Sequence, residues 1–317
     1  MKRLLAVAAA ALVATAAVAQ QVPVDSGIAA YQKASGVSGN ITSVGSDTMN
    51  NMMALWAETF RKLYPSVKIQ IEGKGSGTAP AALIAGTSQF GPMSRPMRPT
   101  EIDQFEAKYG YKPTQIRTSY DALAIYVNKD NPLEKITLAQ ADAIFSKTRR
   151  RGGKSVNTWG DLGLTGDWAN RPISLYGRNS ASGTYGFFKE HTLKNGDYKD
   201  SVKEQPGSAS VVQGVTEDRF GVGYSGIGYK TSGVKALKLA DTGEFFDGTY
   251  ENVRSGKYPL TRFLYVYINK APGKPLDPLV REFMNLVLSK DGQEVVVKDG
   301  YDPLPASIVS EERKKLD

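Results

Sequence analysis

One local pattern recurs along this chain and limits the folds open to it: a short apolar strand, a loop of hydroxyl residues and glycine, then a helix start. The three clearest copies are Asn40–Val44 with Gly45–Thr48, Val67–Ile71 with Gly73–Thr78, and Ile173–Tyr176 with Arg178–Thr184. Strands of this length followed by amphipathic helices are typical of α/β folds. The recurrence therefore predicts an α/β protein in which such loops begin several helices.

The loop Arg178–Thr184 predicts an anion site. The first N–H groups of a helix have no partner inside the helix, and the helix dipole makes that end positive. Arg178 adds a planar fork of donors, and Ser180, Ser182 and Thr184 add hydroxyls around Gly183. We interpret this loop as half of a clamp for a small tetrahedral oxyanion. The alternative is ordinary helix capping, for which Ser and Thr are also preferred.

Three further loops are candidates for the other half of the clamp. Their candidate residues are Ser46, Asp47 and Thr48 in the first loop, Ser76, Gly77 and Thr78 in the second, and Ser94 and Arg95 in the third. Glycines in such loops permit close approach of the backbone to a ligand, or simply a tight turn. Asp121, at the start of a later strand, is an additional candidate.

Two similar strands, Asp121–Lys129 and Arg262–Lys270, lie about 140 residues apart, and both end in Asn-Lys before a proline-containing turn. The simplest account is a two-strand hinge that carries the chain out of one lobe and back into it. We therefore expect lobe 1 to hold residues 40–121 and 263–317, and lobe 2 to hold residues 122–262. A helix over Leu276–Ser289 and the tail after it should pack on lobe 1.

The N-terminus predicts export. Lys2-Arg3, the apolar run Leu4–Val18 and an A-x-A site ending at Ala19 are typical of a cleaved signal peptide over residues 1–19. Residues 20–39 should form a leader that packs loosely on the surface. The chain has no cysteine, so we expect neither a lipid anchor nor a disulfide, and a periplasmic location.

The charge balance favours small anions over nucleic acid. Removing Lys2 and Arg3 lowers the 40 basic residues to 38 against 32 acidic ones, a net charge of +6 that is spread along the chain. The run Arg149–Lys154 is an exception, which we interpret as a solvated loop or, alternatively, as a contact to a membrane partner.

Catalytic patterns are missing from the sequence. The only histidine, His191, is at helical spacing from Phe187 and Phe188, as expected of a packing or surface residue. The chain has no thiol, and it lacks G-x-S-x-G and clustered metal-binding carboxylates. We expect no enzyme activity, no cofactor and no metal; a periplasmic phosphatase would have to act without any of these groups.

In their order along the chain, several short motifs resemble one family. They are Gly45–Met49, Gly75–Thr78, Phe90-Gly91 with Ser94–Pro96, Asp121–Leu123, Ile144–Ser146 with Trp159–Leu162, Arg178 with Ser182–Thr184, and Asp291–Gln293 with Gly300-Tyr301 and Pro303–Pro305. This order is similar to that of the phosphate-binding proteins of bacterial ABC importers, within the type II periplasmic binding proteins. The resemblance implies two α/β lobes with mixed sheets, hinge closure on phosphate in the cleft, a partnership with permease subunits, and a monomer.

The resemblance also implies roles for particular residues. The family's Arg…Ser-Gly-Thr loop matches Arg178 and Ser182–Thr184, its first-loop threonine matches Thr48 with Ser46 nearby, and its glycine-rich-loop serine matches Ser76. Better-known members place in the third loop an aspartate that accepts the proton of phosphate and disfavours sulfate, but this chain has Ser94-Arg95 there.

The loss of that aspartate leaves the acceptor and the ligand open. We hypothesise that Asp47, or secondarily Asp121, takes over the acceptor role, although Asp47 could instead cap its own helix. Receptors for sulfate, molybdate or a phosphonate remain alternatives, as does a phosphate sensor or adhesion-like protein without a transporter.

Overall fold

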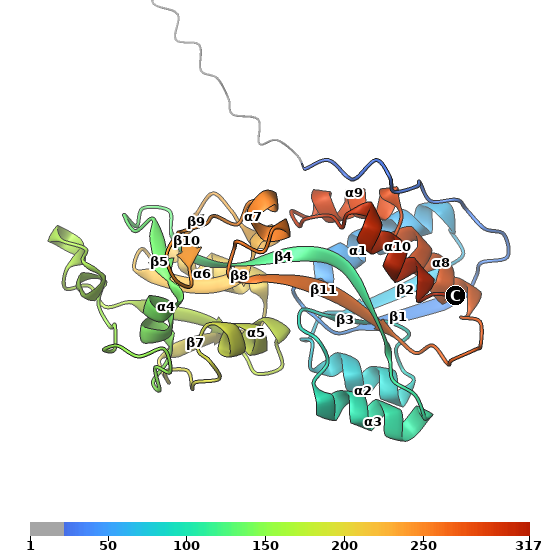
Figure 1. The fold of residues 1–317 in the computed structure, drawn as a ribbon, viewed down its shortest axis with the longest axis horizontal. Coiled ribbons are helices and arrows are strands. Elements are labelled where there is room, and N and C mark those ends of the chain that lie inside the picture. The colour runs from blue at the N-terminus through green and yellow to red at the C-terminus, as the bar shows by residue number, and fades with distance from the viewer. Residues whose placement is uncertain (1–21) are drawn as a thin grey trace, which may run out of the picture.

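The computed structural model describes residues 22–317, so the predicted signal peptide and its cleavage after Ala19 lie outside the described residues. Figure 1 shows two groups of elements, here called the first and the second lobe, joined by the long strands β4 (Thr114–Asn128) and β11 (Thr261–Ile268). No helix within residues 22–317 has the length and apolar character needed to cross a bilayer.

The first lobe combines the N-terminal and C-terminal parts of the described chain. Its elements are β1 (Asn40–Val44), α1 (Asn50–Leu63), β2 (Lys68–Glu72), α2 (Thr78–Ala85), β3 (Gly91–Met93), α3 (Pro99–Tyr109), α8 (Pro278–Val287), α9 (Lys290–Lys298) and α10 (Ala306–Lys314). The apolar face of α1 is buried as its spacing predicts, and Phe60 packs its ring edge-on against Phe283 of α8, with centroids 5.3 Å apart. The two chain segments therefore share one core.

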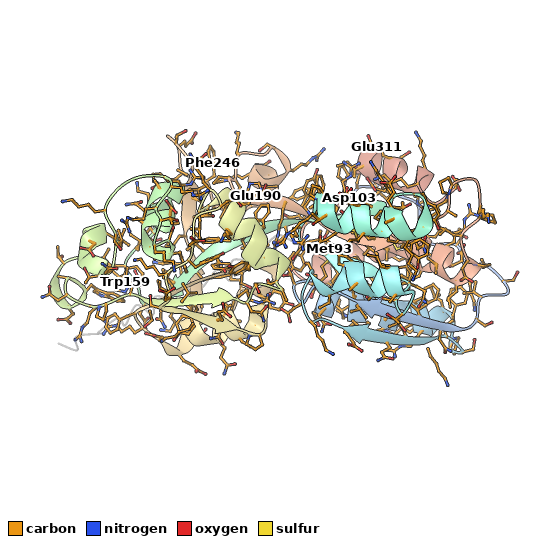
Figure 2. All side chains as sticks on the ribbon, turned by 90° about the horizontal axis from the view of Figure 1, so that it is seen from below. Met93, Asp103, Trp159, Glu190, Phe246 and Glu311 are labelled. Carbon is orange, nitrogen blue, oxygen red and sulfur yellow. The ribbon has the colours of Figure 1, made fainter. Side chains whose placement is uncertain are left out.

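The second lobe holds the chain between β4 and β11. Its elements are β5 (Lys135–Thr137), α4 (Leu138–Phe145), η1 (Trp159–Leu162), η2 (Gly166–Trp168), β6 (Ser174–Arg178), α5 (Gly183–His191), β7 (Val202–Gln205), α6 (Ser208–Glu217), β8 (Gly221–Gly226), η3 (Ile227–Tyr229), β9 (Val234–Ala236), β10 (Lys238–Ala240) and α7 (Tyr250–Arg254). Seen from below, Glu190 of α5 and Met93 of β3 lie on either side of the junction between the lobes (Figure 2).

One mixed sheet passes through both lobes. Its strand order is β3-β11-β4-β8-β6-β7, with β9 also paired to β4, and β4 runs antiparallel to β11 and β8 whereas β6 runs parallel to β7 and β8. The α/β fold class predicted from the sequence is confirmed. β11 lies beside the first half of β4, and Asp121 faces Arg262 across the two strands. The strand predicted to begin at Asp121 was too short at its start, because β4 begins at Thr114, and its residues 123–127 pair with β8 instead. Hinge motion at this crossing, and the lobe limits at residues 121–122 and 262–263, remain predictions.

The leader at residues 22–39 lies mostly exposed on the surface without helix or strand, as expected, and it is fixed to the first lobe at a few points. Ile28 and Val37 are buried, and the Lys290 backbone N–H donates to the Ala29 carbonyl at 2.9 Å. The Tyr31 hydroxyl donates to Glu282 at 2.7 Å. The composition of the segment is small and polar, but a few side chains and backbone groups fix it to the C-terminal helices.

The arginine run after α4 is also only partly solvated. Arg151 donates from Nε to the Thr192 carbonyl and from Nη2 to the His191 carbonyl, each at 2.6 Å, and its side chain is 10% exposed. Cations stabilise the C-terminal end of a helix by pairing with its free carbonyls. Arg151 therefore caps α5, and the solvated-loop interpretation was wrong for this residue.

Candidate functional site

The hydroxyl and glycine loops of both lobes converge. Thr48 and Thr184, from the loop before α1 and the first turn of α5, hydrogen-bond through their hydroxyls at 2.9 Å. The Gly77 backbone N–H donates to the Ala181 carbonyl across the lobes, also at 2.9 Å. The starts of α1, α2 and α5 thus meet in one place, which we call the loop cluster: residues 45–48, 75–78, 94 and 181–184.

Gly183 is required by this convergence. A Cβ atom placed there would lie 2.3 Å from Ser76 Oγ and 2.6 Å from Ser94 Oγ, which is closer than real Cβ contacts. These two serines are themselves joined, with their hydroxyl oxygens 3.2 Å apart. Glycine is the residue type that lets the backbone of the second lobe approach the first so closely.

Arg178 ends β6 and is buried beside the cluster, with 2% of its surface exposed. Its Nη1 donates to Ser208 Oγ at 2.8 Å and lies 3.2 Å from a carboxylate oxygen of Asp47, and its Nη2 donates to the Pro206 carbonyl at 3.2 Å. Its Nε is buried, and no group within residues 22–317 accepts from it. Burial lowers the pKa of Arg178, with Asp47 opposing that effect.

Asp47 caps a helix, but not its own. The residue preceding α1 is Met49, which gives no side-chain cap, whereas an Asp47 carboxylate oxygen accepts from the Ser208 backbone N–H at the start of α6, at 2.7 Å. The Tyr229 hydroxyl donates to the Asp47 carbonyl at 3.0 Å. The simple N-cap alternative was therefore wrong, because Asp47 joins the first lobe to the second.

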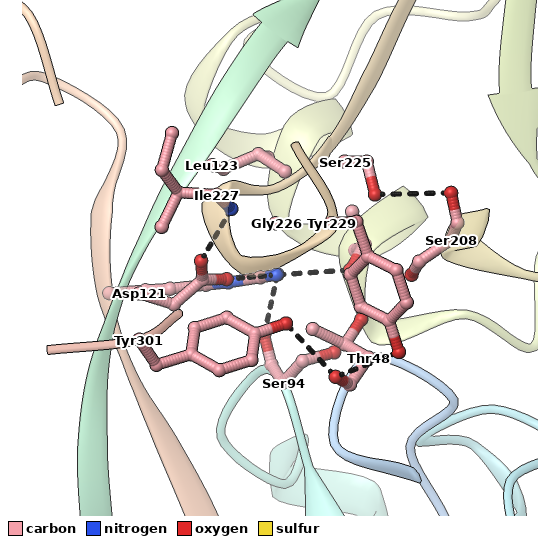
Figure 3. Close-up of polar contacts among 12 residues, drawn as sticks. Thr48, Ser94, Asp121, Leu123, Ser208, Ser225, Gly226, Ile227, Tyr229 and Tyr301 are labelled. Carbon is pink, nitrogen blue, oxygen red and sulfur yellow. Dashed lines mark hydrogen bonds and ion pairs between the residues drawn. The ribbon is translucent and has the colours of Figure 1, made fainter. Parts of the chain in front are cut away.

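Asp121 forms an ion pair with Arg262, and both of its carboxylate oxygens accept hydrogen bonds. Arg262 donates to one oxygen of Asp121 from Nε at 2.8 Å and from Nη2 at 2.6 Å, and the Ile227 backbone N–H donates to the other oxygen at 3.2 Å. The same guanidinium donates to the Ser94 carbonyl at 2.8 Å and to Thr184 Oγ1 at 3.1 Å. Figure 3 shows this network between strand β4 and the loops.

Some predicted site residues lie in the cluster. Ser46, Thr48, Ser76, Ser94, Ser182, Gly183 and Thr184 are buried there, with Gly77 at the start of α2. Ser46 Oγ has no partner within residues 22–317. Ser182 also caps α5 by accepting from the Tyr185 N–H at 3.3 Å, so the capping alternative holds for that side chain.

Three predicted residues point elsewhere. Arg95 makes two hydrogen bonds of 2.7 Å to Glu101 at the start of α3, and Ser180 is exposed on the surface. The Thr78 hydroxyl donates back to the Gly75 carbonyl of its own loop at 2.8 Å. Arg95 and Ser180 therefore lie outside the cluster, and the Thr78 hydroxyl, although within it, is engaged by its own loop.

Four residues were missed by the sequence analysis: Arg262, Ser208, Tyr229 and Tyr301. The two tyrosines donate to backbone carbonyls of the Asp47-Thr48 loop, Tyr301 to Thr48 at 3.0 Å. The similarity of the two strands could have pointed to Arg262, since it stands at the same position in one similar segment as Asp121 does in the other, and the two residues are paired in the structure. No local sequence pattern indicated Ser208, Tyr229 or Tyr301.

The described residues offer no metal site. Within residues 22–317, no three His, Cys, Asp or Glu side chains gather in a way that could hold a metal ion. The donors of the cluster are hydroxyls, backbone N–H groups and a guanidinium, which bind oxyanions.

Known proteins are similar to this chain in sequence and in fold. Residues 30–291 match the family model described as PBP superfamily domain. The phosphate-binding protein PstS of Pseudomonas aeruginosa is 56% identical over 319 residues, covering 100% of this chain and 99% of its own. Protein SphX of Synechococcus elongatus is 29% identical, covering 87% of this chain and 80% of its own.

Among solved structures, an ABC-type phosphate transport receptor from Vibrio cholerae aligns with a TM-score of 0.66 and 22% identity, over 83% of this chain and 100% of that one. At this identity the likeness concerns the fold. Together with the extent of the sequence matches, it leads to one conclusion: the chain belongs to the PBP superfamily, in the family of the PstS phosphate-binding proteins.

Proposed function

We propose that this protein captures inorganic phosphate between its two lobes and delivers it to the permease of an ABC importer. The observation that carries the proposal is the buried Arg178, whose Nε lacks an acceptor within residues 22–317 beside three convergent helix starts. A buried donor without an acceptor is costly, and an oxyanion would satisfy it. The PstS relative, 56% identical over the whole chain, carries the name phosphate-binding protein.

Tight binding needs several donors at once. A micromolar dissociation constant requires about −8 kcal/mol, and each hydrogen bond to a charged group contributes roughly 1.5–3 kcal/mol before the costs of association. We propose that the Arg178 guanidinium, the cluster hydroxyls and the N–H groups at the helix starts turn toward the anion together when it binds. Because the loops come from both lobes, ligand capture and lobe closure should be coupled.

Asp47 is the better candidate for the group that accepts the proton of phosphate. Both oxygens of Asp121 already accept hydrogen bonds, one of them from Arg262. Asp47 has one oxygen engaged by Ser208 N–H and Arg178, while its other oxygen accepts no hydrogen bond from residues 22–317. A carboxylate with a free oxygen can accept a hydrogen bond from the proton that phosphate retains, and it repels sulfate, which has no proton to donate.

The test is calorimetric titration of protein stripped of bound anion, with phosphate and then sulfate, at pH 5 and pH 8. We expect micromolar or tighter phosphate binding and no sulfate binding. Asp47→Asn should weaken phosphate about tenfold or more, about 1.4 kcal/mol, and gain sulfate. Asp103→Asn, an exposed change on α3, is the matched control.

Each other outcome has a definite meaning. Equal binding of phosphate and sulfate by the unmodified protein would make it a general oxyanion receptor. If neither anion binds, the proposal is wrong, and helix capping remains as the role of the loops. If Asp47→Asn binds phosphate and sulfate as the unmodified protein does, Asp47 is not the acceptor, but the proposal of phosphate capture is unaffected.

The remaining parts of the proposal concern chemistry and location. The PstS relative is named a phosphate-binding protein, and we propose that this chain likewise binds phosphate without catalysing a reaction. His191 packs against the Phe187 ring, with centroids 4.1 Å apart, as expected of a packing residue. We further propose periplasmic location after cleavage behind Ala19, which N-terminal sequencing of secreted protein would test.

A further inference from the structure

Two tyrosines of the second lobe connect the ends of the anion loop, Arg178–Thr184, through one chain of hydrogen bonds. The Arg178 backbone N–H donates to the Tyr224 hydroxyl at 3.2 Å. The Tyr224 hydroxyl donates to that of Tyr198 at 3.1 Å, and the Tyr198 hydroxyl donates to the Tyr185 carbonyl at 3.0 Å. Tyr185 follows directly after the loop, in the first turn of α5, so these bonds span the whole loop. We call them the tyrosine relay.

The direction of the relay is fixed at both ends. A backbone N–H can only donate and a carbonyl can only accept, so both hydroxyl protons have to point from Arg178 toward Tyr185. Each hydroxyl between them accepts one hydrogen bond and donates one. Hydrogen bonds in such a chain polarise one another, and removal of one member leaves its neighbour without a partner. The relay should therefore act as a unit, which the loss of either hydroxyl breaks.

The rings that carry the two hydroxyls are held by aromatic packing. Tyr224 of β8 is fully buried and stacks on Phe188 of α5, with centroids 4.0 Å apart and an angle of 6° between the rings. Phe145 packs edge-on against Tyr224 at 5.6 Å, and Tyr198 stacks on Tyr185 at 4.6 Å. Side chains locked in this way can hold a binding site in one geometry. The hydroxyls are therefore fixed points against which the loop is placed.

The structure of β6 allows the relay to form. The pairing of β6 with β8 ends at Tyr176 and Gly223, so the Arg178 N–H lies beyond it and is bonded by a side chain of β8 instead. A Cβ atom at Gly177 would lie 3.1 Å from the Tyr224 hydroxyl oxygen, which is closer than an ordinary Cβ contact. Glycine at this position therefore lets the hydroxyl reach the backbone of the strand.

The hydrogen bonds inside the loop are short in range. The Ser182 N–H donates to the Asn179 carbonyl at 3.0 Å, and the Ala181 N–H donates to Asn179 Oδ1 at 3.2 Å. These turn bonds shape the middle of the loop but do not fix the distance between Arg178 and the start of α5. The relay does fix it, and its bonds to the two ends of the loop are all to backbone atoms. The Arg178 guanidinium takes no part in the relay.

We propose that Tyr224 and Tyr198 are positioning residues for anion capture, which hold the loop in its binding geometry before the anion arrives. This rests on the proposed function, because the loop supplies Arg178 and the hydroxyls of Ser182 and Thr184. Ordering a loop in advance removes part of the entropy cost of binding, and a loop that is competent only part of the time binds more weakly by that fraction. The two tyrosines therefore raise phosphate affinity without contacting phosphate.

The experiment compares Tyr224→Phe, Tyr198→Phe and the double variant with the unmodified chain, each stripped of bound anion. Calorimetry should show phosphate affinity about tenfold lower in each single variant, because the loop is no longer held in advance. The double variant should be no weaker than the weaker single variant, since either change breaks the same unit. Hydrogen exchange measured without phosphate should be about fivefold faster or more in residues 178–184 of each variant, and unchanged in α6.

Tyr258→Phe is the matched control. It removes another buried tyrosine hydroxyl, which donates to the Leu123 carbonyl of β4 at 3.1 Å and takes no part in the relay. This control should leave phosphate affinity and the exchange of residues 178–184 unchanged, even where it lowers the free energy of unfolding. A merely structural role of the relay tyrosines would give the same result as the control.

The outcomes separate this proposal from the one it rests on. Normal phosphate affinity in both single variants overturns the relay proposal, as does an additive loss in the double variant or an equal loss in the control. Failure of the unmodified protein to bind phosphate concerns the proposed function, and the exchange comparison, which needs no ligand, still shows whether the relay orders the loop. Tyr198→Phe, at the less buried of the two rings, keeps the test valid if Tyr224→Phe does not fold.

Discussion

Arg178 and Arg262 are both buried arginines at the junction of the lobes, yet their surroundings differ. Arg262 is held by a carboxylate, a carbonyl and a hydroxyl, with bonds of 2.6 to 3.1 Å to Asp121, Ser94 and Thr184. Arg178 has a longer contact to its carboxylate, 3.2 Å to Asp47, and a buried Nε that no described residue satisfies.

The difference separates a structural arginine from one available to a ligand. A buried charge is tolerated when it is paired and hydrogen-bonded. Arg262 meets that condition within the protein, whereas Arg178 meets it only in part. The comparison therefore predicts that Arg262 acts mainly on stability and Arg178 mainly on anion affinity.

The largest expected effect is on stability. Arg262→Met should lower the free energy of unfolding by about 3–5 kcal/mol, because it leaves the Asp121 carboxylate buried and unpaired. Chemical denaturation followed by circular dichroism measures this. Adding Asp121→Leu should recover much of the loss, since the unpaired charge is then gone; equal instability of the single and double variants would show that the ion pair is not the cause.

The second effect concerns affinity. Arg178→Ala should weaken phosphate by more than about 2 kcal/mol, roughly 30-fold, because a charged fork of donors is lost from a buried site. Calorimetric titration measures it. The matched control is Arg149→Ala/Arg150→Ala, which removes two cations from the same lobe and should leave affinity nearly unchanged. Similar losses in both variants would mean that general charge attracts the anion and that Arg178 has no special place.

The smallest expected effect is on the pH dependence of stability. It tests, on a carboxylate, whether a buried charge without a partner is costly. Asp302 is buried, its Oδ2 has no partner within residues 22–317, and burial, with Asp121 nearby, raises its pKa to about 7. A raised folded-state pKa stabilises the protein at low pH, and that contribution is lost as pH rises from about 4 through about 7.

Asp302→Asn should therefore stabilise the protein more at pH 8 than at pH 4, because asparagine carries no charge to bury at either pH. Thermal melts of both proteins across this range measure the difference. The groups to consider around Asp302 include Asp121 and Tyr250, so Tyr250→Phe is the control. A stability difference that does not change with pH would show that Asp302 does not titrate in this range.

Much of the fold follows from local sequence. The strand predicted over Asn40–Val44 has those bounds in the structure, and the helix predicted over Leu276–Ser289 appears as α8, Pro278–Val287. Apolar periodicity and glycine or proline at loop positions are short-range properties, so they can be recognised within a window of a few residues. The same holds for the loop motifs that carry the family resemblance.

The partners of charged groups could not be predicted in that way. Arg95 and Arg178 both lie where a strand passes into a loop with serine, yet Arg95 pairs with Glu101 six positions away and Arg178 lies beside Asp47, 131 positions away along the chain. Asp47 is a plausible cap for α1 on sequence alone, and it caps α6 of the other lobe. The partner of each side chain depends on where loops that are distant in sequence lie in the folded protein.

The sequence by itself thus determined the α/β class, the order of the elements and the loops that carry oxyanion donors. The tertiary structure decided which arginine has all its partners within the protein and which carboxylate keeps a free oxygen. The physical reason is range: secondary structure follows from propensity and periodicity within a segment, whereas pairing a buried charge depends on packing between segments more than a hundred residues apart.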